Sequence, residues 1–594
     1  MRLLMSQKRS RYAVLIVAVC AVLCFSASLG WALPGDSGRA GEAYGRNHAQ
    51  AVSRSVQEML RAGEARGVDY QEVLEGAKSR EALYREVLPE KVAWMKGVAR
   101  GAGISYEDLL ILNTAHRQMT GFVGECTTFI AQGSALEAGH GALIAKNRDL
   151  GAHTISEVAL EEAREYEDTA LYRGAYIDIP QAAKTYRFVG SRSAGRWGYG
   201  MGINEKQVAV SDNDAPTRDA LSFTEGLHDN DYVRLVLERA GTAREGVEIL
   251  TKLTEKYGQA WNSIMFEIAD PQELWVVEIA GYRWVAKKYE NTVTARSNQF
   301  QITDDYDFAA EDLISFAVSK GWIPAGTKRI NFRAVYGGTS LYPEDNENLE
   351  NRPATEILYN TEVRYQRAME LLKGIEGAVS PKAVLPLVRD HYDVYTLPSG
   401  EVLELEQVPF YSSKCADMQE WIIQFPEKDT VEKSIFPRPI CHHGLGGITA
   451  SSAILVTRPD LPNELGAMLH CIMQPCNSLF VPFYVGASSV DPRFTSPEAG
   501  SLFMTISKVA FGAYRMYHEV IRSVFDPYEE ALFGDMASLE KDYAGLVAEK
   551  KMEEAQKLLD AFGAEKTEQA YMLAKKAITA MFKTAAESSA WSRD

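Results

Sequence analysis

With 594 residues the chain is longer than one ordinary domain, and its hydrophobic fraction of 46% with a charged fraction of 24% is typical of a globular protein with a full core. The formal net charge of −17 argues against nucleic acid or an anionic membrane surface as a partner. Composition alone gives no information about the substrate.

The first 32 residues have the pattern of a secretory signal peptide. An apolar run over residues 13–29 follows a basic start and ends at Gly30-Trp31-Ala32, a small-x-small cleavage site. We therefore expect an exported protein, periplasmic or extracellular. If the segment were retained, it would anchor the chain in a membrane, because the apolar run is close to the length of a transmembrane span.

Residues 33–125 are predicted to form a helical pro-segment. Apolar residues recur three and four positions apart in RNHAQAVSRSVQEMLRAG and in SREALYREVLPEKVAWMKGVARGAG. Ser105 is placed to cap a further helix that begins near Leu109. The segment could cover a catalytic residue until the chain is cut, or it could be a permanent helical subdomain. The two interpretations are compatible if the cut halves stay packed.

A hairpin is predicted directly after this segment. Cys126 opens an apolar run that is typical of a strand, and a second apolar run, residues 142–145, follows a turn sequence at residues 138–141. The second run ends in Lys146-Asn147-Arg148-Asp149. In an antiparallel pair of this length, Asp149 folds back beside Cys126.

That geometry suits an N-terminal nucleophile, in which the chain is cut between Glu125 and Cys126 and the freed α-amino group serves as the base for its own thiol. An α-amino group has a reference pKa of about 7.7–8.0 and a thiol about 8.5, so both exchange protons near neutral pH. Asp149 would hold the ammonium or the thiol in place. The alternative is a buried structural Cys with a surface Asp in a turn, since free Cys is among the most buried residue types.

Residues 126–500 are predicted to form one catalytic domain of the α+β class, because strands and helices come in runs. Strands are expected at 197–202, 208–211, 264–268, 274–279, 284–287, 293–296, 449–457 and within 468–486. Helices are expected at 231–240, 243–257, 361–372 and 381–388. Residues 501–594 should form a helical C-terminal region whose apolar stripe is a packing surface.

The cysteines outside the predicted signal peptide are odd in number: Cys126, Cys415, Cys441, Cys471 and Cys476. In an exported protein this count favours two disulfides with Cys126 as the free thiol. Cys441-His442-His443 with His470-Cys471 and Cys476 could also be metal ligands, but their spacing matches no common ligand pattern, so structural disulfides are the preferred interpretation. No metal or cofactor is predicted.

Several segments, in order, resemble the N-terminal-nucleophile cysteine hydrolases. CTTFIAQ…GALIAKNRD resembles the mature start of that superfamily. RWGYGMGINEKQVAVSDND, NSIMFEIADPQELWVVEIAGYRWVAKK, RDHYD and LFVPFYVGA look like its dipeptidase A branch. GVARGAGISYEDLLILN is similar to the pro-segment of the acyl-CoA:isopenicillin N acyltransferase family. The chain thus resembles a dipeptidase-type body behind an acyltransferase-type pro-segment.

The resemblance implies a four-layer αββα sandwich, the Ntn-hydrolase fold, with Cys126 as nucleophile and Asp149 as its catalytic Asp. Asn298 corresponds to an Asn near the nucleophile whose side-chain N–H would stabilise the oxyanion, and Asn213 corresponds to a second such position. Either Asn could instead satisfy a turn.

The resemblance also implies supporting residues. Lys146 stands where many relatives have Arg, so the contact with the thiol would come from Lys146 or Arg148, and a Lys cannot bind bidentately as an Arg does. Asn147 and Arg296 are expected to support the site. The cluster Arg389-Asp390-His391-Tyr392 either lies at the site or forms buried ion pairs that hold two segments together.

These features predict a self-processing, exported cysteine hydrolase that cleaves amide bonds of small peptides through a thioester on Cys126. An amide acylase or acyltransferase is the second hypothesis. A papain-like enzyme is disfavoured because no Cys lies in a setting such as Cys-Gly-Ser-Cys-Trp. An inactive binding protein on the same fold stays open. The expected partner is a peptide or amide substrate, and the oligomeric state is not predicted.

We expect export with cleavage after Ala32, because the basic start, the apolar core and the small-x-small end occur together. N-terminal sequencing of the protein recovered from fractionated cells measures this. Recovery from the cytosol with residues 1–32 still attached would contradict the prediction.

Overall fold

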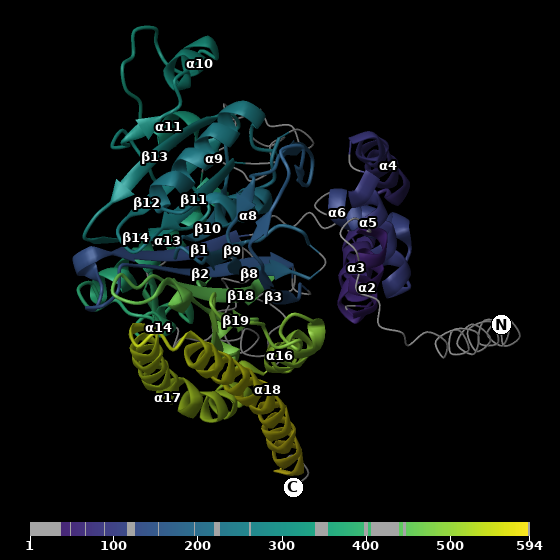
Figure 1. The fold of residues 1–594 in the computed structure, drawn as a ribbon, viewed down its shortest axis with the longest axis vertical. Helices are drawn as coiled ribbons and strands as arrows, with labels where there is room; N and C mark the ends of the chain where they lie inside the picture. The colour runs from purple at the N-terminus through teal and green to yellow at the C-terminus, as the bar shows by residue number, and fades with distance from the viewer. Residues whose placement is uncertain are drawn as a thin grey trace, which may run out of the picture.

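The computed structural model describes residues 37–591 except 48, 66, 88, 116–124, 152–153, 195, 219–225, 261–262, 339–354, 397–401, 405–438, 444–446 and 512. The predicted signal peptide and Cys415 lie outside the described residues. Two antiparallel sheets lie face to face, and helices cover their outer faces (Figure 1). Among the described helices, none is both long and apolar enough to cross a lipid bilayer.

The predicted hairpin lies in a six-stranded sheet. In spatial order its strands are β14 (Thr292–Arg296), β1 (Glu125–Gln132), β2 (Ala142–Gly151), β18 (Gly447–Val456), β19 (Ala467–Ile472) and β20 (Phe480–Tyr484). The β-branched and aromatic residues at the start of β1 favour an extended backbone. Gly139 adopts a φ of 91° in the connection to β2, a conformation that favours glycine.

The second sheet has eight strands. In spatial order they are β15 (Phe308–Ala309), β13 (Arg283–Tyr289), β12 (Leu274–Ala280), β11 (Ser263–Ala269), β10 (Ala209–Ala215), β9 (Met201–Asn204), β8 (Phe188–Ser193) and β3 (Ser156–Glu161). Every residue of β10, β11 and β12 is buried. Such burial requires cover on both faces of the sheet, which explains why these strands are near-continuous apolar runs.

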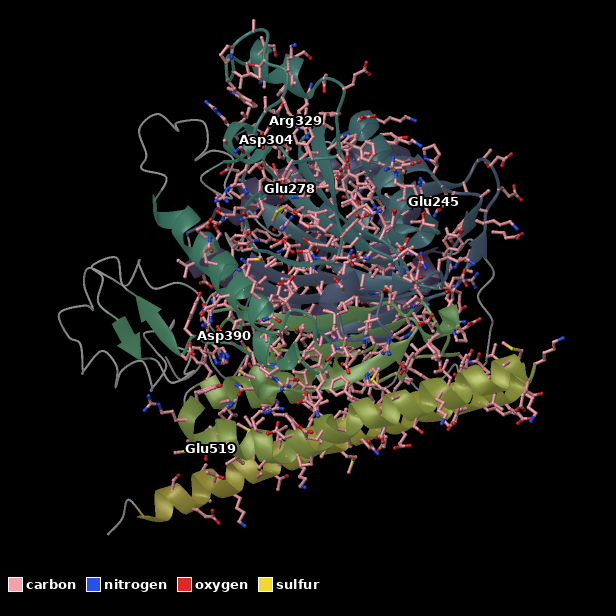
Figure 2. All side chains as sticks on the ribbon, turned by 90° about the vertical axis from the view of Figure 1, so that its left-hand side faces the viewer. Glu245, Glu278, Asp304, Arg329, Asp390 and Glu519 are labelled. Carbon is pink, nitrogen blue, oxygen red and sulfur yellow. The ribbon has the colours of Figure 1, made fainter. Side chains whose placement is uncertain are left out.

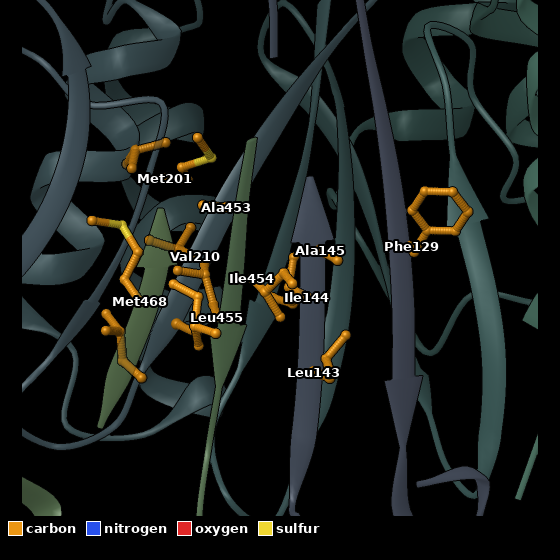
Figure 3. Close-up of a cluster of buried hydrophobic side chains, with 14 of the residues drawn as sticks. Phe129, Leu143, Ile144, Ala145, Met201, Val210, Ala453, Ile454, Leu455 and Met468 are labelled. Carbon is orange, nitrogen blue, oxygen red and sulfur yellow. The ribbon is translucent and has the colours of Figure 1, made fainter. Parts of the chain in front are cut away.

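Helices complete the outer layers. The eight-stranded sheet is covered by α8 (Asp229–Arg239) and α9 (Ala243–Tyr257). The six-stranded sheet is covered by α13 (Thr355–Gly374), α14 (Leu385–Val388), α16 (Pro497–Phe511), α17 (Tyr514–Ala548) and α18 (Met552–Trp591). One continuous cluster of buried apolar side chains runs through all four layers, and Figure 3 shows part of it on both sheets. The predicted α+β sandwich of four layers is confirmed.

The N-terminal helices form a bundle beside the sheets (Figure 1). They are α2 (Ser37–Asn47), α3 (Ala49–Ala65), α4 (Tyr70–Val87), α5 (Pro89–Ala102) and α6 (Tyr106–Thr114), and they have an apolar core of their own. As predicted, Ser105 caps α6, because its Oγ accepts a hydrogen bond from the backbone N–H of Asp108 at 3.3 Å. The hydroxyl of Tyr44 donates to Glu157 Oε1 at 3.2 Å and connects the bundle to β3.

Short elements fill the connections: η1 (Gly133–Ala135), β4 (Arg164–Glu165), β5 (Leu171–Arg173), β6 (Asp178–Pro180), β7 (Lys184–Thr185), α10 (Leu313–Ser319), α11 (Phe332–Tyr336), β16 (Val394–Thr396), β17 (Val402–Glu404), η4 (Asn463–Leu465) and η5 (Pro475–Asn477). The helix predicted over 381–388 is reduced to the last four residues, α14. Both Pro386 within it and the turns before it limit its length.

The strand predicted over 197–202 begins only at Met201. The preceding residues bend because Gly198 and Gly200 lie where other side chains approach the backbone. A Cβ added at Gly200 would lie 2.5 Å from Nε of Arg148, and one at Gly198 would lie 2.5 Å from Cβ of Asn230. These glycines therefore make room for neighbouring side chains instead of extending the strand.

The cluster at residues 389–392 forms the buried ion pairs that were one of its two interpretations. Nη2 of Arg389 donates to both carboxylate oxygens of Glu529 in α17, at 2.6 and 2.7 Å. The carboxylate of Asp390, labelled in Figure 2 near the C-terminal helices, accepts two hydrogen bonds from Arg367 in α13, at 3.0 and 2.7 Å. These pairs hold the loop after α14 between two helices.

We expect Glu529→Ala to lower the free energy of unfolding by about 3 kcal/mol, because Arg389 and Arg522 would lose the buried carboxylate that they share. Its neighbour Glu530 is the matched control, since it is 71% exposed and pairs with an exposed Lys382. Glu530→Ala should cost about 0–1 kcal/mol. Denaturant unfolding followed by tryptophan fluorescence compares the two, and equal losses would contradict this role of Glu529.

Candidate active site

The register of β1 and β2 decides which side chains surround Cys126. Cys126 lies opposite Arg148, and Thr128 lies opposite Lys146. Directly opposed residues and every second residue of a strand share one face of a sheet. These four side chains therefore point toward the eight-stranded sheet, where Thr128 and Lys146 contact β10. Asn147 points the other way, toward α14.

Asn298 holds the backbone nitrogen of Cys126. That nitrogen donates to Oδ1 of Asn298 at 2.8 Å, and the side-chain nitrogen of Asn298 donates to the carbonyl of Asp214 at 2.8 Å. The last ladder pair of β14 and β1 is Arg296 with Thr128, and two further steps in the same register bring Asn298 opposite Cys126. A side-chain oxygen therefore takes the place of a ladder carbonyl at this position.

Arg364, on helix α13, holds the carbonyl of the same residue. Its Nη1 donates to Cys126 O at 2.8 Å and to Thr127 Oγ1 at 2.9 Å, and its Nη2 donates to Asn298 Oδ1 at 2.8 Å. The side chain is fully buried. Both backbone polar groups of Cys126 are thus fixed by side chains from other elements.

Arg364 was not predicted from the sequence. Charged residues are frequent around it in α13, and such a pattern is typical of a solvent-exposed helix face. The only hint in the sequence is that a helix follows Asn298 in the chain. This hint does not tell which Arg of that helix contacts Cys126.

Lys146 carries a buried positive charge near Cys126. Its Nζ donates to Gly200 O at 3.2 Å and to Asp212 Oδ1 at 2.5 Å, and it also donates to the backbone carbonyl of Asp212. Burial raises the pKa of the Cys126 thiol to about 12, and the charge of Lys146 opposes this rise. The buried thiol of an internal Cys126 is therefore protonated at neutral pH.

Asp149 is 1% exposed, so the alternative of a surface Asp in a turn is wrong. Its Oδ1 accepts from Thr449 Oγ1 at 2.6 Å, and Thr449 Oγ1 in turn accepts from the backbone N–H of His442 at 2.8 Å. Together with burial, the charge of Asp149 raises the pKa of the Cys126 thiol. By the alternation of β2, its side chain lies on the same face as Asn147, whereas Cys126 and Arg148 face the eight-stranded sheet.

The other predicted site residues lie around this centre. Asn147 donates to the carbonyls of Val388 and Ile440, both at 2.8 Å, and so ties two loops to β2. Arg148 donates to Ser193 Oγ at 3.2 Å and to Asn230 Oδ1 at 3.3 Å. The hydrogen bonds of Asn147 and Arg148 therefore go to residues around Cys126 and not to the backbone of Cys126.

Asn213 and Arg296 join parts of the fold. Asn213 accepts from Thr128 Oγ1 at 2.7 Å and donates to Ser297 O at 3.1 Å, so it connects the two sheets instead of satisfying a turn. Arg296 is fully buried, donates to Tyr289 OH at 2.6 Å and lies 3.7 Å from Glu278 Oε1. Asn213 is thus tied to Ser297, the residue before Asn298, and Arg296 lies two positions before Asn298 in the chain.

A cavity of about 200 Å³ lies between the N-terminal helices and the body. Its lining combines Trp94 and Asn113 of the bundle with Trp197, His228 and Asn230 of the body. Through Asn230, which contacts Arg148 and Asp212, the cavity borders the polar network around Lys146. Cys126 itself is 7% exposed and does not line the cavity.

The predicted disulfides are absent from the described part of the chain. Cys126, Cys441, Cys471 and Cys476 are all free thiols there. Cys126 is free, as predicted, but two disulfides would require a pair among Cys441, Cys471 and Cys476, so that part of the prediction is wrong. It followed from the assumed oxidising compartment.

Comparison with known proteins adds the family. Probable dipeptidase A from Streptococcus pyogenes serotype M3 (strain SSI-1) is 24% identical over 383 residues, which cover 59% of this chain and 72% of that protein. Probable dipeptidase A from serotype M1 is 25% identical over 351 residues, which cover 54% of this chain and 66% of that protein.

Two solved structures are also similar. A mutant conjugated bile acid hydrolase from Clostridium perfringens has a TM-score of 0.31 and 10% identity, covering 62% of this chain and 98% of that chain. Penicillin V acylase from Agrobacterium tumefaciens has a TM-score of 0.29 and 12% identity, covering 60% of this chain and 86% of that chain.

The model of peptidase family C69 matches residues 125–531. The match starts one residue before Cys126, includes both sheets and spans more than half of the sequence. The chain therefore belongs to peptidase family C69.

Proposed function

We propose that this C69 peptidase is an exported, self-processing enzyme that cleaves amide bonds of small peptides with Cys126 as its N-terminal nucleophile. The hydrogen bond from the nitrogen of Cys126 to Asn298 Oδ1 carries the proposal. A carboxamide oxygen accepts from an amide N–H before cleavage and from an ammonium after it. The nitrogen is therefore held in one place in both states.

Self-processing comes first, because an amide nitrogen has no useful basicity. Sγ of Cys126 attacks the carbonyl carbon of Glu125, and the acyl group moves from nitrogen to sulfur. Water then opens the thioester, which leaves a carboxylate on Glu125 and a free amine on Cys126. The amine has an ordinary pKa of about 7.7–8.0 and becomes the base for the thiol.

Substrate cleavage repeats the same chemistry on another bond. Sγ adds to the substrate carbonyl, and the α-ammonium gives its proton to the leaving amine. Water, activated by the α-amino group, then releases the acyl product from the thioester. Asn298 and Arg364 fix the backbone of Cys126 and thereby hold its amine and its thiol in a constant relative position. Asp149 and Lys146 set the charge around them.

Small peptides are the preferred substrate class because the curated relatives are named probable dipeptidases. An amide acylase or acyltransferase is the second candidate, and it is favoured by one observation. The segment GVARGAGISYEDLLILN, which spans the end of α5 and most of α6, is similar to the pro-segment of acyltransferases. A panel of dipeptides and N-acyl amino acids assayed with the processed enzyme separates the two.

We expect Cys126→Ala to remain a single uncut chain with no peptidase activity, because no side chain remains at this position to attack Glu125. Cys126→Ser should be cut slowly, since an oxygen can make the same acyl shift through an ester. Intact mass and N-terminal sequencing read the outcome. A wild-type enzyme that is fully active with Glu125 and Cys126 still joined would falsify the assignment, as would normal cleavage of the Ala variant.

We expect Asn298→Ala to lower turnover by roughly 10²-fold or more, because the nitrogen of Cys126 would lose the acceptor that holds it in position. Asn213→Ala is the comparison, since its amide is engaged by Thr128 and Ser297 and its loss should mainly reduce stability. Steady-state kinetics with circular dichroism controls test both variants. Turnover of the Asn298 variant within a few-fold of wild type would remove Asn298 from the site.

A further inference from the structure

Two cysteines and two histidines meet in the interior, outside the site described above. The ligand atoms of His391, Cys441, His443 and Cys476 all lie within 4.8 Å of one another, and all four residues are buried. Nε2 of His443 lies 3.1 Å from Sγ of Cys476 and 3.6 Å from Sγ of Cys441. The two imidazole rings pack edge to face, with 5.0 Å between their centroids.

Three segments that are distant in the sequence supply these residues. His391 follows α14, Cys441 and His443 precede β18, and Cys476 lies in η5 between β19 and β20. The backbone N–H of Cys441 donates to Asp390 O at 3.0 Å, and Nε of Arg389 donates to Pro475 O at 2.9 Å. The segments are therefore already fastened to one another close to the cluster.

The backbone next to the cluster adopts an unusual conformation. Tyr392, directly after His391, has a φ of 66°, a region that favours glycine and strains the backbone of a bulky residue. Strain of this kind persists where the surroundings determine the conformation, and it is common at ligand-binding positions. Here it turns the chain immediately after a residue of the cluster.

We propose that His391, Cys441, His443 and Cys476 bind a structural zinc ion. Two sulfur and two nitrogen ligands in a tetrahedron are typical of Zn²⁺, and four protein ligands make a closed, structural site. Bond lengths of about 2.3 Å to sulfur and 2.0–2.1 Å to nitrogen require separations of roughly 3.3–3.8 Å between ligand atoms. Of the two distances from His443 Nε2, 3.6 Å fits that range and 3.1 Å is slightly below it, and no separation in the cluster exceeds 4.8 Å. Binding therefore needs shifts of about 1 Å or less.

Charge balance also favours a divalent ion. On binding, the thiols of Cys441 and Cys476 lose their protons to solvent, and the two thiolates neutralise the charge of Zn²⁺. The interior thus receives no net charge, which avoids the large cost of burying an unpaired ion. Tyr514 of α17 packs on both cysteines and forms a hydrogen bond with Cys476, so a second layer of contacts covers the cluster.

The cluster lies behind the catalytic strand. Asn147 in β2 donates to Val388 O and Ile440 O, which are three residues and one residue away from the ligands His391 and Cys441. Thr449 links the backbone N–H of His442 to the carboxylate of Asp149. A bound ion would therefore stabilise the loops against which β2 holds Asn147 and Asp149.

The first experiment measures metal in the purified full-length protein after incubation with one equivalent of Zn²⁺ and removal of the excess. Elemental mass spectrometry should find about one zinc per chain in the wild type and less than a tenth of that in Cys476→Ser and in His443→Ala. Cys471→Ser is the matched control, because Cys471 is also a buried free thiol but lies outside the cluster, and it should keep its zinc.

A second experiment does not depend on whether the variants fold. Wild-type protein loaded with Co²⁺ should show the visible absorption of tetrahedral cobalt with thiolate ligands. A chelator should lower its midpoint of thermal unfolding by about 5 °C or more, and Zn²⁺ but not Mg²⁺ should restore it.

Three results would overturn the proposal: no zinc in the wild type, equal zinc in wild type and Cys476→Ser, or a Cys441 to Cys476 disulfide in peptide maps of unreduced protein. None of these readouts depends on peptidase activity, so the zinc proposal and the proposed function can fail separately.

Discussion

The backbone of Cys126 is held by two buried side chains, and this constraint organises the rest of the site. The side-chain oxygen of Asn298 accepts a hydrogen bond from the N–H of Cys126, and Arg364 donates one to the carbonyl of Cys126. Arg364 also donates to the side-chain oxygen of Asn298. A buried guanidinium needs several acceptors at fixed angles, so it tolerates little displacement. The start of β1, the residues after β14 and helix α13 are therefore locked to one another at Cys126.

Successive side chains of strand β2 point to opposite faces of the sheet and make contacts with different layers. Lys146 and Arg148 face the second sheet. Lys146 donates to Asp212 in β10, and Arg148 donates to Asn230 in α8. Asn147 faces the outer helices and fixes the loops there. A register slip of one residue would exchange the two faces, so the pairing of β2 must be tightly specified. On its other side, β18 carries a register shift between Thr449 and Ser451, at the residue that contacts Asp149.

The sequence predicts those helices and strands that depend on local residue patterns. The hairpin with Cys126 and Asp149, strands β10 to β13 and the helices at both ends follow from periodicity and capping, and the register brings Cys126 to Arg148. Strands β3 and β8 of the second sheet are not predicted. Arg364 could not be found this way, because its role comes from the packing of α13 on the sheet. Similarly, Cys441, His443 and Cys476 were noted as candidate ligands, but His391 joins them only through the fold, while His470 bonds Ser191 instead.

The electrostatics around Cys126 also differ between an internal and an N-terminal residue. With Cys126 internal, burial and the charges of Asp212, Asp149 and Asp214 raise the pKa of the thiol, and the charge of Lys146 opposes them. Three carboxylates are a poor environment for an internal thiol that must ionise. Asp149 and Asp214 are a more favourable environment for a buried α-ammonium, since the charge of Asp212 is already balanced by Lys146. Cleavage before Cys126 would therefore convert an unfavourable arrangement of charges into a favourable one, in which a neutral thiol and its base belong to the same residue.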